Sequence, residues 1–215
     1  MDVPSDLKNK NELMKPALLY LITFTAGYLC GSVMNAQIIT RFVKGIDIRG
    51  IGNNNPGAAN TFKNVGPFWG ILAGVLDALK SLVPLLLGHY VFHLTPIALG
   101  FMGFGAVIGH GHPLYFRFRG GRAAATLMGV FLFFIPLELL AGFIVSPVIV
   151  YSFIKTDRSY WTPFGIITIS ALTALFTNHP VEIKTIVFAV AILGLFLNRF
   201  YLPEMAGNLK SKSKD

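Results

Sequence analysis

The chain has 215 residues, of which 53% are hydrophobic and 13% are charged. A soluble globular domain carries about 25% charged residues, so this composition excludes an ordinary soluble domain and indicates a membrane protein with several spans. The net charge of +8 does not indicate nucleic-acid binding, because the basic residues of multi-pass membrane proteins gather in cytoplasmic loops.

Residues 1–16 form a polar N-terminal tail of mixed charge, unlike the basic start of a signal peptide. Seven apolar segments follow, at 17–40, 66–88, 92–110, 123–135, 137–154, 163–178 and 183–201. We expect one transmembrane domain over 17–203 and a basic cytoplasmic tail over 204–215. Cys30 is the only cysteine, which excludes disulfides and cysteine-rich zinc sites, and no metal or cofactor is expected.

The fourth and fifth apolar segments allow two topologies, either two spans or one long helix kinked at Pro136. With seven spans and the N-terminus outside, thirteen of the 18 Lys and Arg residues fall on the cytoplasmic side, as the positive-inside rule favours. Merging the two segments would place Lys155 and Arg158 outside. The sequence therefore predicts an all-α polytopic membrane protein with about seven transmembrane helices, an external N-terminus and a cytoplasmic C-terminus.

The first long polar loop, residues 41–65, contains GIDIRGIGNNNPGAANTFKNVG. Its Gly and Asn residues allow positive φ, so successive backbone N–H groups can converge on an anion. Arg49 can add a bidentate grip on phosphate. Taken alone, the loop fits an ordinary Gly/Asn-rich turn better than an anion site.

The second apolar segment contains an ionisable pair. Asp77 and Lys80 stand three positions apart, on one face of a helix, where each can neutralise the charge of the other. A purely structural ion pair and a role in ordering an active site are equally compatible with this spacing.

The second polar loop, residues 111–122, follows GHGHP, which contains His110 and His112. We interpret these histidines as hydrogen-bonded residues near the membrane surface, because no carboxylate lies nearby to complete a metal site. The loop continues into RFRGGRAAAT, residues 117–126, where two glycines and an arginine precede a predicted helix. A helix N-terminus, a close backbone and an arginine together favour an anion, although positive-inside charge also explains the arginines.

Several motifs are absent from the chain. The P-loop pattern is missing, so nucleotide binding is not indicated. There is no G-x-S-x-G nucleophile elbow, and no histidine is followed five positions later by aspartate as in acyl-CoA glycerolipid acyltransferases. We therefore expect chemistry without a side-chain nucleophile and its usual base.

Three blocks together resemble the bacterial acyl-phosphate:glycerol-3-phosphate acyltransferases of the PlsY family. They are AGYLCGSVMNAQIITRFVKGIDIRGIGNNNPGAANTFKNVG, GVLDALKSLVPLLLG and VIGHGHPLYFRFRGGRAAAT, which cover most of residues 26–128. The resemblance implies a seven-helix enzyme of the bacterial plasma membrane that forms lysophosphatidate in phospholipid synthesis. Its expected partners are membrane lipid, glycerol 3-phosphate and acyl phosphate, without nucleic acid; the oligomeric state stays open.

The resemblance also implies a set of site residues. Ser32, Arg49 and Arg122 take the catalytic positions, with Arg122 in place of the family's phosphate-binding lysine. Asn55 and Asn60 match the asparagines of the first loop, and Gly120 and Gly121 match the glycine pair of the second. With Gly57, His110 and Thr126, which belong to the same polar segments, they are expected to bind substrate and phosphate. Asp77 and Lys80 are expected either to order this site or to form a structural ion pair. In the family, a substrate phosphate oxygen is thought to accept the proton of the attacking hydroxyl.

The late part of the chain departs from the family pattern. The family has an active-site histidine in a late stretch that corresponds to NRFYLPEMAG here, and this stretch contains none. A catalytically impaired paralogue that binds phosphorylated or acyl ligands is therefore the alternative function. A small organic-anion transporter is a weaker alternative, because the chain shows no repeated halves.

Overall fold

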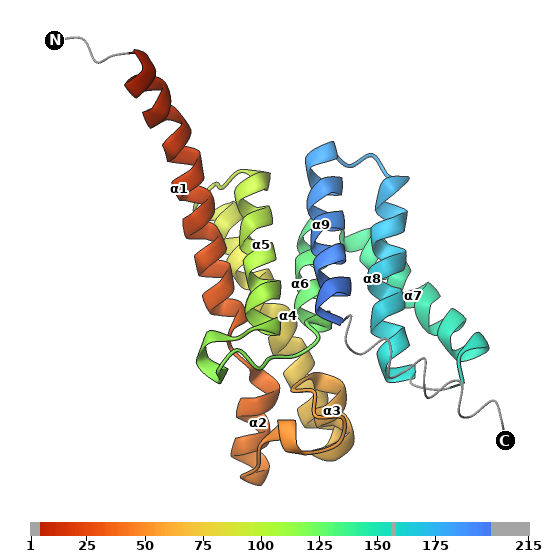
Figure 1. Cartoon of the computed structure of the whole chain (residues 1–215). Coiled ribbons are helices and arrows are strands. Elements are labelled where there is room, and N and C mark those ends of the chain that lie inside the picture. Colours follow the sequence, from red (N-terminus) through yellow and green to blue (C-terminus); the bar gives the residue numbers. More distant parts are fainter. Residues whose placement is uncertain (1–4, 156–157, 199–215) are drawn as a thin grey trace.

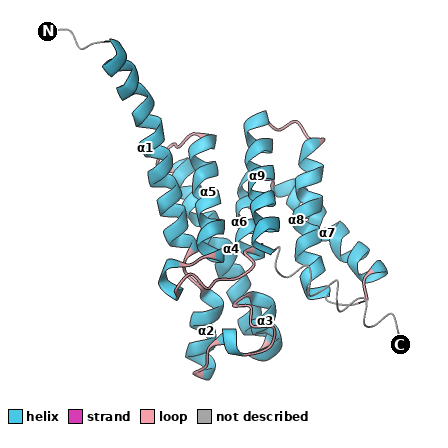
Figure 2. Cartoon of the chain, viewed as in Figure 1, coloured by secondary structure: helices cyan, strands magenta, loops and turns pink. Residues whose placement is uncertain are grey.

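The computed structural model describes residues 5–155 and 158–198, and this part of the chain consists of helices and loops without a strand (Figure 1 and Figure 2). The helices of the bundle are α1 (Ser5–Gly31), α4 (Pro67–Tyr90), α5 (Pro96–Gly111), α6 (Ala124–Phe134), α7 (Pro136–Phe153), α8 (Arg158–Leu175) and α9 (Val181–Asn198). Two shorter helices, α2 (Asn35–Lys44) and α3 (Ala58–Asn64), and the 3-10 turns η1 (Ile48–Gly50) and η2 (Leu114–Phe116) lie in the polar connections.

The predicted all-α membrane architecture is confirmed. In the described residues, five stretches are long and apolar enough to cross a membrane: Lys15–Lys44, Pro67–Tyr90, Pro96–Phe116, Pro136–Phe153 and Val181–Asn198. Helix α6 is also apolar, but it is shorter than these five stretches and is not counted among them. The total of seven spans and their orientation stay predictions.

The limits of the first helix differ from the prediction. Helix α1 begins at Ser5, so most of the predicted tail at 1–16 is helical, and it ends at Gly31 rather than at residue 40. The chain breaks at 32–34 and then starts the separate helix α2. The predicted tail at 204–215 lies outside the described residues.

Helices α6 and α7 are two separate helices, so the alternative of one kinked helix is wrong. Ile135 between them has φ −142° and ψ 60°, and Pro136 is the first residue of α7, where its missing N–H costs no helical hydrogen bond. Helix α7 then returns toward the end of the bundle at which α6 begins (Figure 1). At the other end of the bundle, Oε1 of Glu138, near the start of α7, lies 2.8 Å from Nε2 of His179 in the α8–α9 connection.

Helices α1 and α5 pack closely through two pairs of glycines. A methyl group on Gly27 or Gly31 would collide with the backbone of α5, and one on Gly105 or Gly109 would collide with the backbone of α1. Small residues four positions apart are a common means of close approach between transmembrane helices. This packing brings the end of α1 beside the end of α5, where two polar segments meet.

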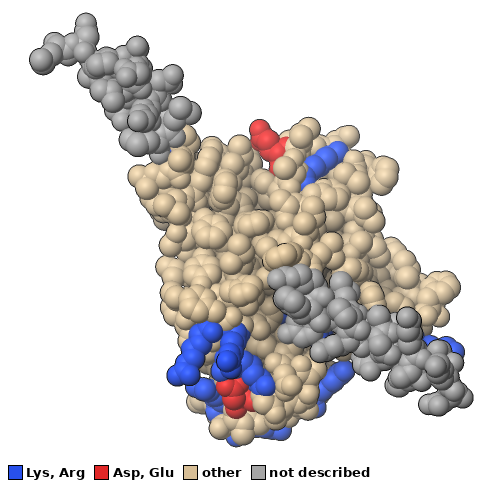
Figure 3. All heavy atoms as spheres, viewed as in Figure 1, with Lys and Arg blue, Asp and Glu red and all other residues tan. Residues whose placement is uncertain are grey.

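Basic residues gather at one end of the bundle, around α2 and the loops 45–57 and 112–123 (Figure 3). Arg41, Lys44, Arg49, Arg117 and Arg119 belong to these segments. The connection at the opposite end, between α8 and α9, is followed by one acidic and one basic residue, Glu182 and Lys184. By the positive-inside rule, we predict that the basic end faces the cytoplasm.

Cysteine labelling tests this topology. In a Cys30→Ala background, Asn178→Cys at the α8–α9 connection should react with an impermeant thiol reagent in intact cells, whereas Ser159→Cys at the start of α8 should not. Both side chains are exposed in the structure, so that access from one side of the membrane decides the result. External labelling of Ser159→Cys would overturn the predicted orientation.

Candidate functional site

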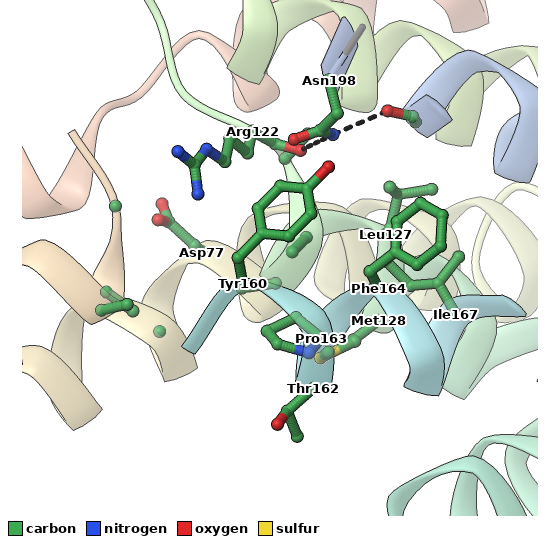
Figure 4. A pocket seen from close by; sticks show the side chains of 18 of the residues that line it. Asp77, Arg122, Leu127, Met128, Tyr160, Thr162, Pro163, Phe164, Ile167 and Asn198 are labelled. Carbon is green, nitrogen blue, oxygen red and sulfur yellow. Dashed lines mark hydrogen bonds between the residues drawn. The ribbon is translucent and has the colours of Figure 1, made fainter. Parts of the chain in front are cut away.

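A cavity of about 990 Å³ lies among α3, α4, α6, α7, α8 and α9, next to the basic end of the bundle. Its polar part is lined by Asn55, Gly57, Asp77, His110 and Arg122, which come from the loops and the helix ends nearest to them. Its apolar part is lined by residues deeper in the bundle, which include Leu127, Met128, Leu132, Phe143, Phe164 and Ile167. Figure 4 shows Arg122 and Asp77 on one side of the pocket and Leu127, Phe164 and Ile167 on the other.

A buried ionic cluster supports the polar part of the cavity. The ammonium nitrogen of Lys80 lies 3.0 Å from Oδ1 of Asp77, 2.6 Å from the carbonyl oxygen of Val33 and 2.8 Å from Nδ1 of His110. An ammonium group has three protons, so these three acceptors satisfy it. Asn35 donates a further hydrogen bond of 2.9 Å to Oδ1 of Asp77. The predicted pair therefore forms and joins α4 to α2, α5 and the break after α1.

The contacts of His110 determine where its proton lies. Because Nδ1 accepts from Lys80 and lies 3.2 Å from Oγ1 of Thr126, the neutral ring carries its proton on Nε2. A Cβ atom placed on Gly121 would lie 2.6 Å from Nε2, so this N–H group lies directly against the glycine loop. The ring is buried and lines the cavity as a hydrogen-bond donor.

The second loop has no room for a side chain at either of its two glycines. A side chain on Gly120 would collide with the carbonyl oxygens of His110 and Gly111, and the amide of Gly121 donates a 3.0 Å hydrogen bond to the former. Helix α6 begins directly afterwards, as predicted, at Ala124. Its N-cap residue Ala123 has φ 59°, a left-handed conformation that costs an alanine about 1–2 kcal/mol. The backbone here is thus held in a strained form beside the cavity.

Arg122 extends from this loop into the cavity. The central carbon of its guanidinium group lies 4.9 Å from the ring centroid of Tyr160 at the start of α8, a cation–π contact. Its carbonyl oxygen accepts a 3.2 Å hydrogen bond from the amide of Asn198 at the end of α9 (Figure 4). Neither Tyr160 nor Asn198 was predicted as a site residue, because no motif in the sequence links them to the second loop.

The first loop is held together by Asn60. Its amide nitrogen donates to the carbonyl oxygens of Ile48 (3.2 Å) and Ile51 (3.0 Å), and its oxygen accepts from the amide of Asn64 at 2.8 Å. The side chain is buried and is not among those that line the cavity. The hydrogen bonds of Asn60 therefore stabilise the turn in which Asn55 and Gly57 line the cavity.

Arg49 joins the two polar loops. Its guanidinium group binds both carboxylate oxygens of Asp47, at 3.0 and 2.7 Å, and donates a 3.3 Å hydrogen bond to the carbonyl oxygen of Phe116. The hydrogen bond from Arg49 lowers the pKa of Asp47 to about 2. Arg49 lies outside the cavity lining, so the structure gives it contacts that hold loops together.

Ser32 also links the end of α1 to the second loop. Its hydroxyl group donates to the carbonyl oxygen of Tyr28 at 2.8 Å and accepts from the amide of Leu114 at 3.2 Å. Of the twelve predicted site residues, five line the cavity, namely Asn55, Gly57, Asp77, His110 and Arg122. The other seven are not among the residues that line it: Ser32, Arg49, Asn60, Lys80, Gly120, Gly121 and Thr126.

The chain is similar to proteins of known family. The family model described as glycerol-3-phosphate acyltransferase matches residues 21–202. The glycerol-3-phosphate acyltransferase of Shouchella clausii is 35% identical over 202 residues, which cover 89% of this chain and 95% of that protein. Its counterpart from Aquifex aeolicus is 32% identical over 183 residues, which cover 84% and 91%.

Solved structures give the same result. The crystal structure of PlsY, an integral membrane glycerol 3-phosphate acyltransferase, in its glycerol 3-phosphate form matches with a TM-score of 0.78 and 27% sequence identity. The match covers 88% of this chain and 92% of that chain. The lysophosphatidic acid form matches with a TM-score of 0.76.

Proposed function

The chain belongs to the glycerol-3-phosphate acyltransferase family, and we propose that it transfers an acyl group from acyl phosphate to the sn-1 hydroxyl of glycerol 3-phosphate. The products are lysophosphatidate and inorganic phosphate. As a multi-pass membrane protein of a bacterial family, it would act at the cytoplasmic face of the plasma membrane, where its basic end attracts anionic substrates.

The shape and chemistry of the cavity carry this proposal. One continuous cavity joins a polar part, lined by Arg122, His110 and Asn55, to an apolar part lined by α6, α7 and α8. An acyl phosphate has the same division, with an anionic head and a hydrocarbon chain. Glycerol 3-phosphate is polar throughout and fits the polar part beside the head of the donor.

The reaction needs positioning and charge stabilisation more than a side-chain nucleophile. The sn-1 oxygen forms a bond to the acyl carbon, the bond from that carbon to the phosphate oxygen breaks, and the hydroxyl proton passes to the phosphate. In this proposal, Arg122 and the Nε2–H group of His110 bind the negative charge that develops on the substrate oxygens. The buried side-chain oxygen of Asn55 makes no hydrogen bond within the described chain, and as an acceptor it suits a glycerol hydroxyl.

A second candidate function is a binding protein without catalysis. It is favoured by one observation: His110 is the one histidine among the described residues that line the cavity, and the family's late histidine has no counterpart in the stretch NRFYLPEMAG of the sequence. Such a protein would bind glycerol 3-phosphate and form no lysophosphatidate. Formation of lysophosphatidate by the purified protein separates the two functions.

We predict that the purified protein in detergent forms lysophosphatidate from palmitoyl phosphate and glycerol 3-phosphate, and forms little from palmitoyl-CoA. Phosphate is a good leaving group and brings its own proton acceptor, whereas a thioester donor requires a general base. The measurement is the rate of transfer of labelled glycerol 3-phosphate into lysophosphatidate with each donor. Comparable rates with both donors would contradict the proposed donor.

A further inference from the structure

Tyr160 has an unusual environment for a tyrosine. Its side chain lies at the start of α8, is 7% exposed and lines the cavity. Its hydroxyl oxygen is buried and makes no hydrogen bond to any residue in 5–155 or 158–198. More than nine in ten buried polar groups in proteins have a partner, and an unpaired one destabilises the folded state. A phenylalanine would avoid this cost, so the hydroxyl requires an explanation.

The ring of Tyr160 holds the charged group of the loop. The guanidinium group of Arg122 lies over the ring at 4.9 Å from the centroid, which restricts where the arginine can place its N–H donors. Ring and guanidinium group therefore form one rigid unit at the wall of the cavity. The hydroxyl belongs to the same side chain, which lines the cavity together with Arg122.

The position of this unit along the cavity indicates which ligand it meets. Tyr160 lies between polar lining residues, Arg122 and Asn198, and the apolar side chains of Leu127 and Phe164 (Figure 4). The head group of a molecule with a hydrocarbon tail lies at such a boundary, because the tail fills the apolar part. A small polar molecule such as glycerol 3-phosphate remains beyond it.

We propose that the hydroxyl of Tyr160 donates a hydrogen bond to the phosphate of the acyl donor, the same phosphate that Arg122 binds. This inference rests on the proposed function, since it names a residue that binds the donor of that reaction. Tyr160 then has two tasks, because its ring orients Arg122 and its hydroxyl contacts the substrate. The donor phosphate becomes the partner that the buried hydroxyl lacks.

Tyr160→Phe separates these tasks, since phenylalanine keeps the ring beneath Arg122 and removes only the hydroxyl. The KM for palmitoyl phosphate should rise by about tenfold, the usual effect of losing one hydrogen bond to a charged group, with the KM for glycerol 3-phosphate unchanged. The melting temperature should not fall, because no partner is left unsatisfied. Tyr115→Phe is the control, since Tyr115 is exposed on η2 and lies outside the cavity lining.

Tyr160→Leu removes ring and hydroxyl together and should lower kcat as well, because Arg122 loses its support. An unchanged KM for palmitoyl phosphate in Tyr160→Phe, or a rise confined to the KM for glycerol 3-phosphate, would overturn the inference.

Binding of decyl phosphate, measured as a shift in melting temperature, keeps this test independent of turnover. Wild type should be stabilised more than Tyr160→Phe at the same concentration of this alkyl phosphate. A wild type that binds decyl phosphate but forms no lysophosphatidate would contradict the proposed function alone. Equal stabilisation of wild type and Tyr160→Phe would contradict the role of the hydroxyl.

Discussion

Replacement of Arg122 by alanine should lower turnover by about 10²–10³-fold, the usual effect of removing one preorganised electrostatic contact from an active site. Arg122 lines the cavity, and its guanidinium group lies over the ring of Tyr160, so under the proposed function it would meet a substrate phosphate with little reorganisation. The variant should remain folded, because the hydrogen bond between this loop and Asn198 uses the carbonyl oxygen of Arg122, which alanine keeps. Steady-state rates and melting temperatures of the purified variant check both statements.

Two further variants make this result specific. Arg122→Lys should keep part of the activity, because the charge survives while the bidentate geometry is lost. Arg117→Ala is the matched control, since Arg117 is an exposed arginine of the same loop that lies outside the cavity lining. Equal and mild effects of Arg117→Ala and Arg122→Ala would show that the loop arginines serve only membrane topology.

The helical framework follows from the sequence because apolar runs of spanning length have few alternatives in a membrane. The segments predicted at 66–88 and 92–110 correspond to α4 and α5 within a few residues. The first run was wrongly extended to residue 40, because apolar composition continues across the break at 32–34. That break depends on contacts between distant segments, such as the hydrogen bond from the amide of Leu114 to Ser32, which composition does not reveal.

The site was predictable where its residues stand in loops with a local pattern. The glycines of the second loop and Arg122 form such a pattern, and the structure places Arg122 in the cavity. Arg49 fitted the same expectation of phosphate binding, yet Asp47 binds its guanidinium group. Asp47 stands only two positions before Arg49 in the sequence. An ion pair between these two side chains was therefore a visible alternative to phosphate binding by Arg49.

Tyr160 could not be predicted from the sequence. Its contact with Arg122 depends on packing between the start of α8 and the loop before α6, and no spacing rule connects these two segments. An aromatic residue in an apolar helix is normally a core residue or contacts lipid. The unpaired buried hydroxyl distinguishes Tyr160 from such residues, and it becomes visible only in the folded chain.

Replacement of Lys80 by methionine should lower the free energy of unfolding by about 3–5 kcal/mol, because removing one member of a buried pair leaves the other charge uncompensated. Asp77 is 1% exposed. In the variant it would keep the hydrogen bond from the side-chain amide of Asn35, but this amide carries no charge. Thermal or denaturant unfolding in detergent measures this loss. The double variant Asp77→Asn/Lys80→Met should recover most of it, because neither charge then remains buried.

The activity of the double variant distinguishes the two roles that the sequence leaves open for this pair. Lys80 donates to Nδ1 of His110, and this contact keeps the proton on Nε2, the nitrogen that lies against Gly121. Without the ammonium group, the ring is free to carry its proton on Nδ1 and to present an acceptor to the substrate. We therefore expect the double variant to fold and yet to lose about 10²-fold in kcat, the low end of what a lost electrostatic contact costs. A stable double variant with wild-type kcat would show that Asp77 and Lys80 serve the fold alone.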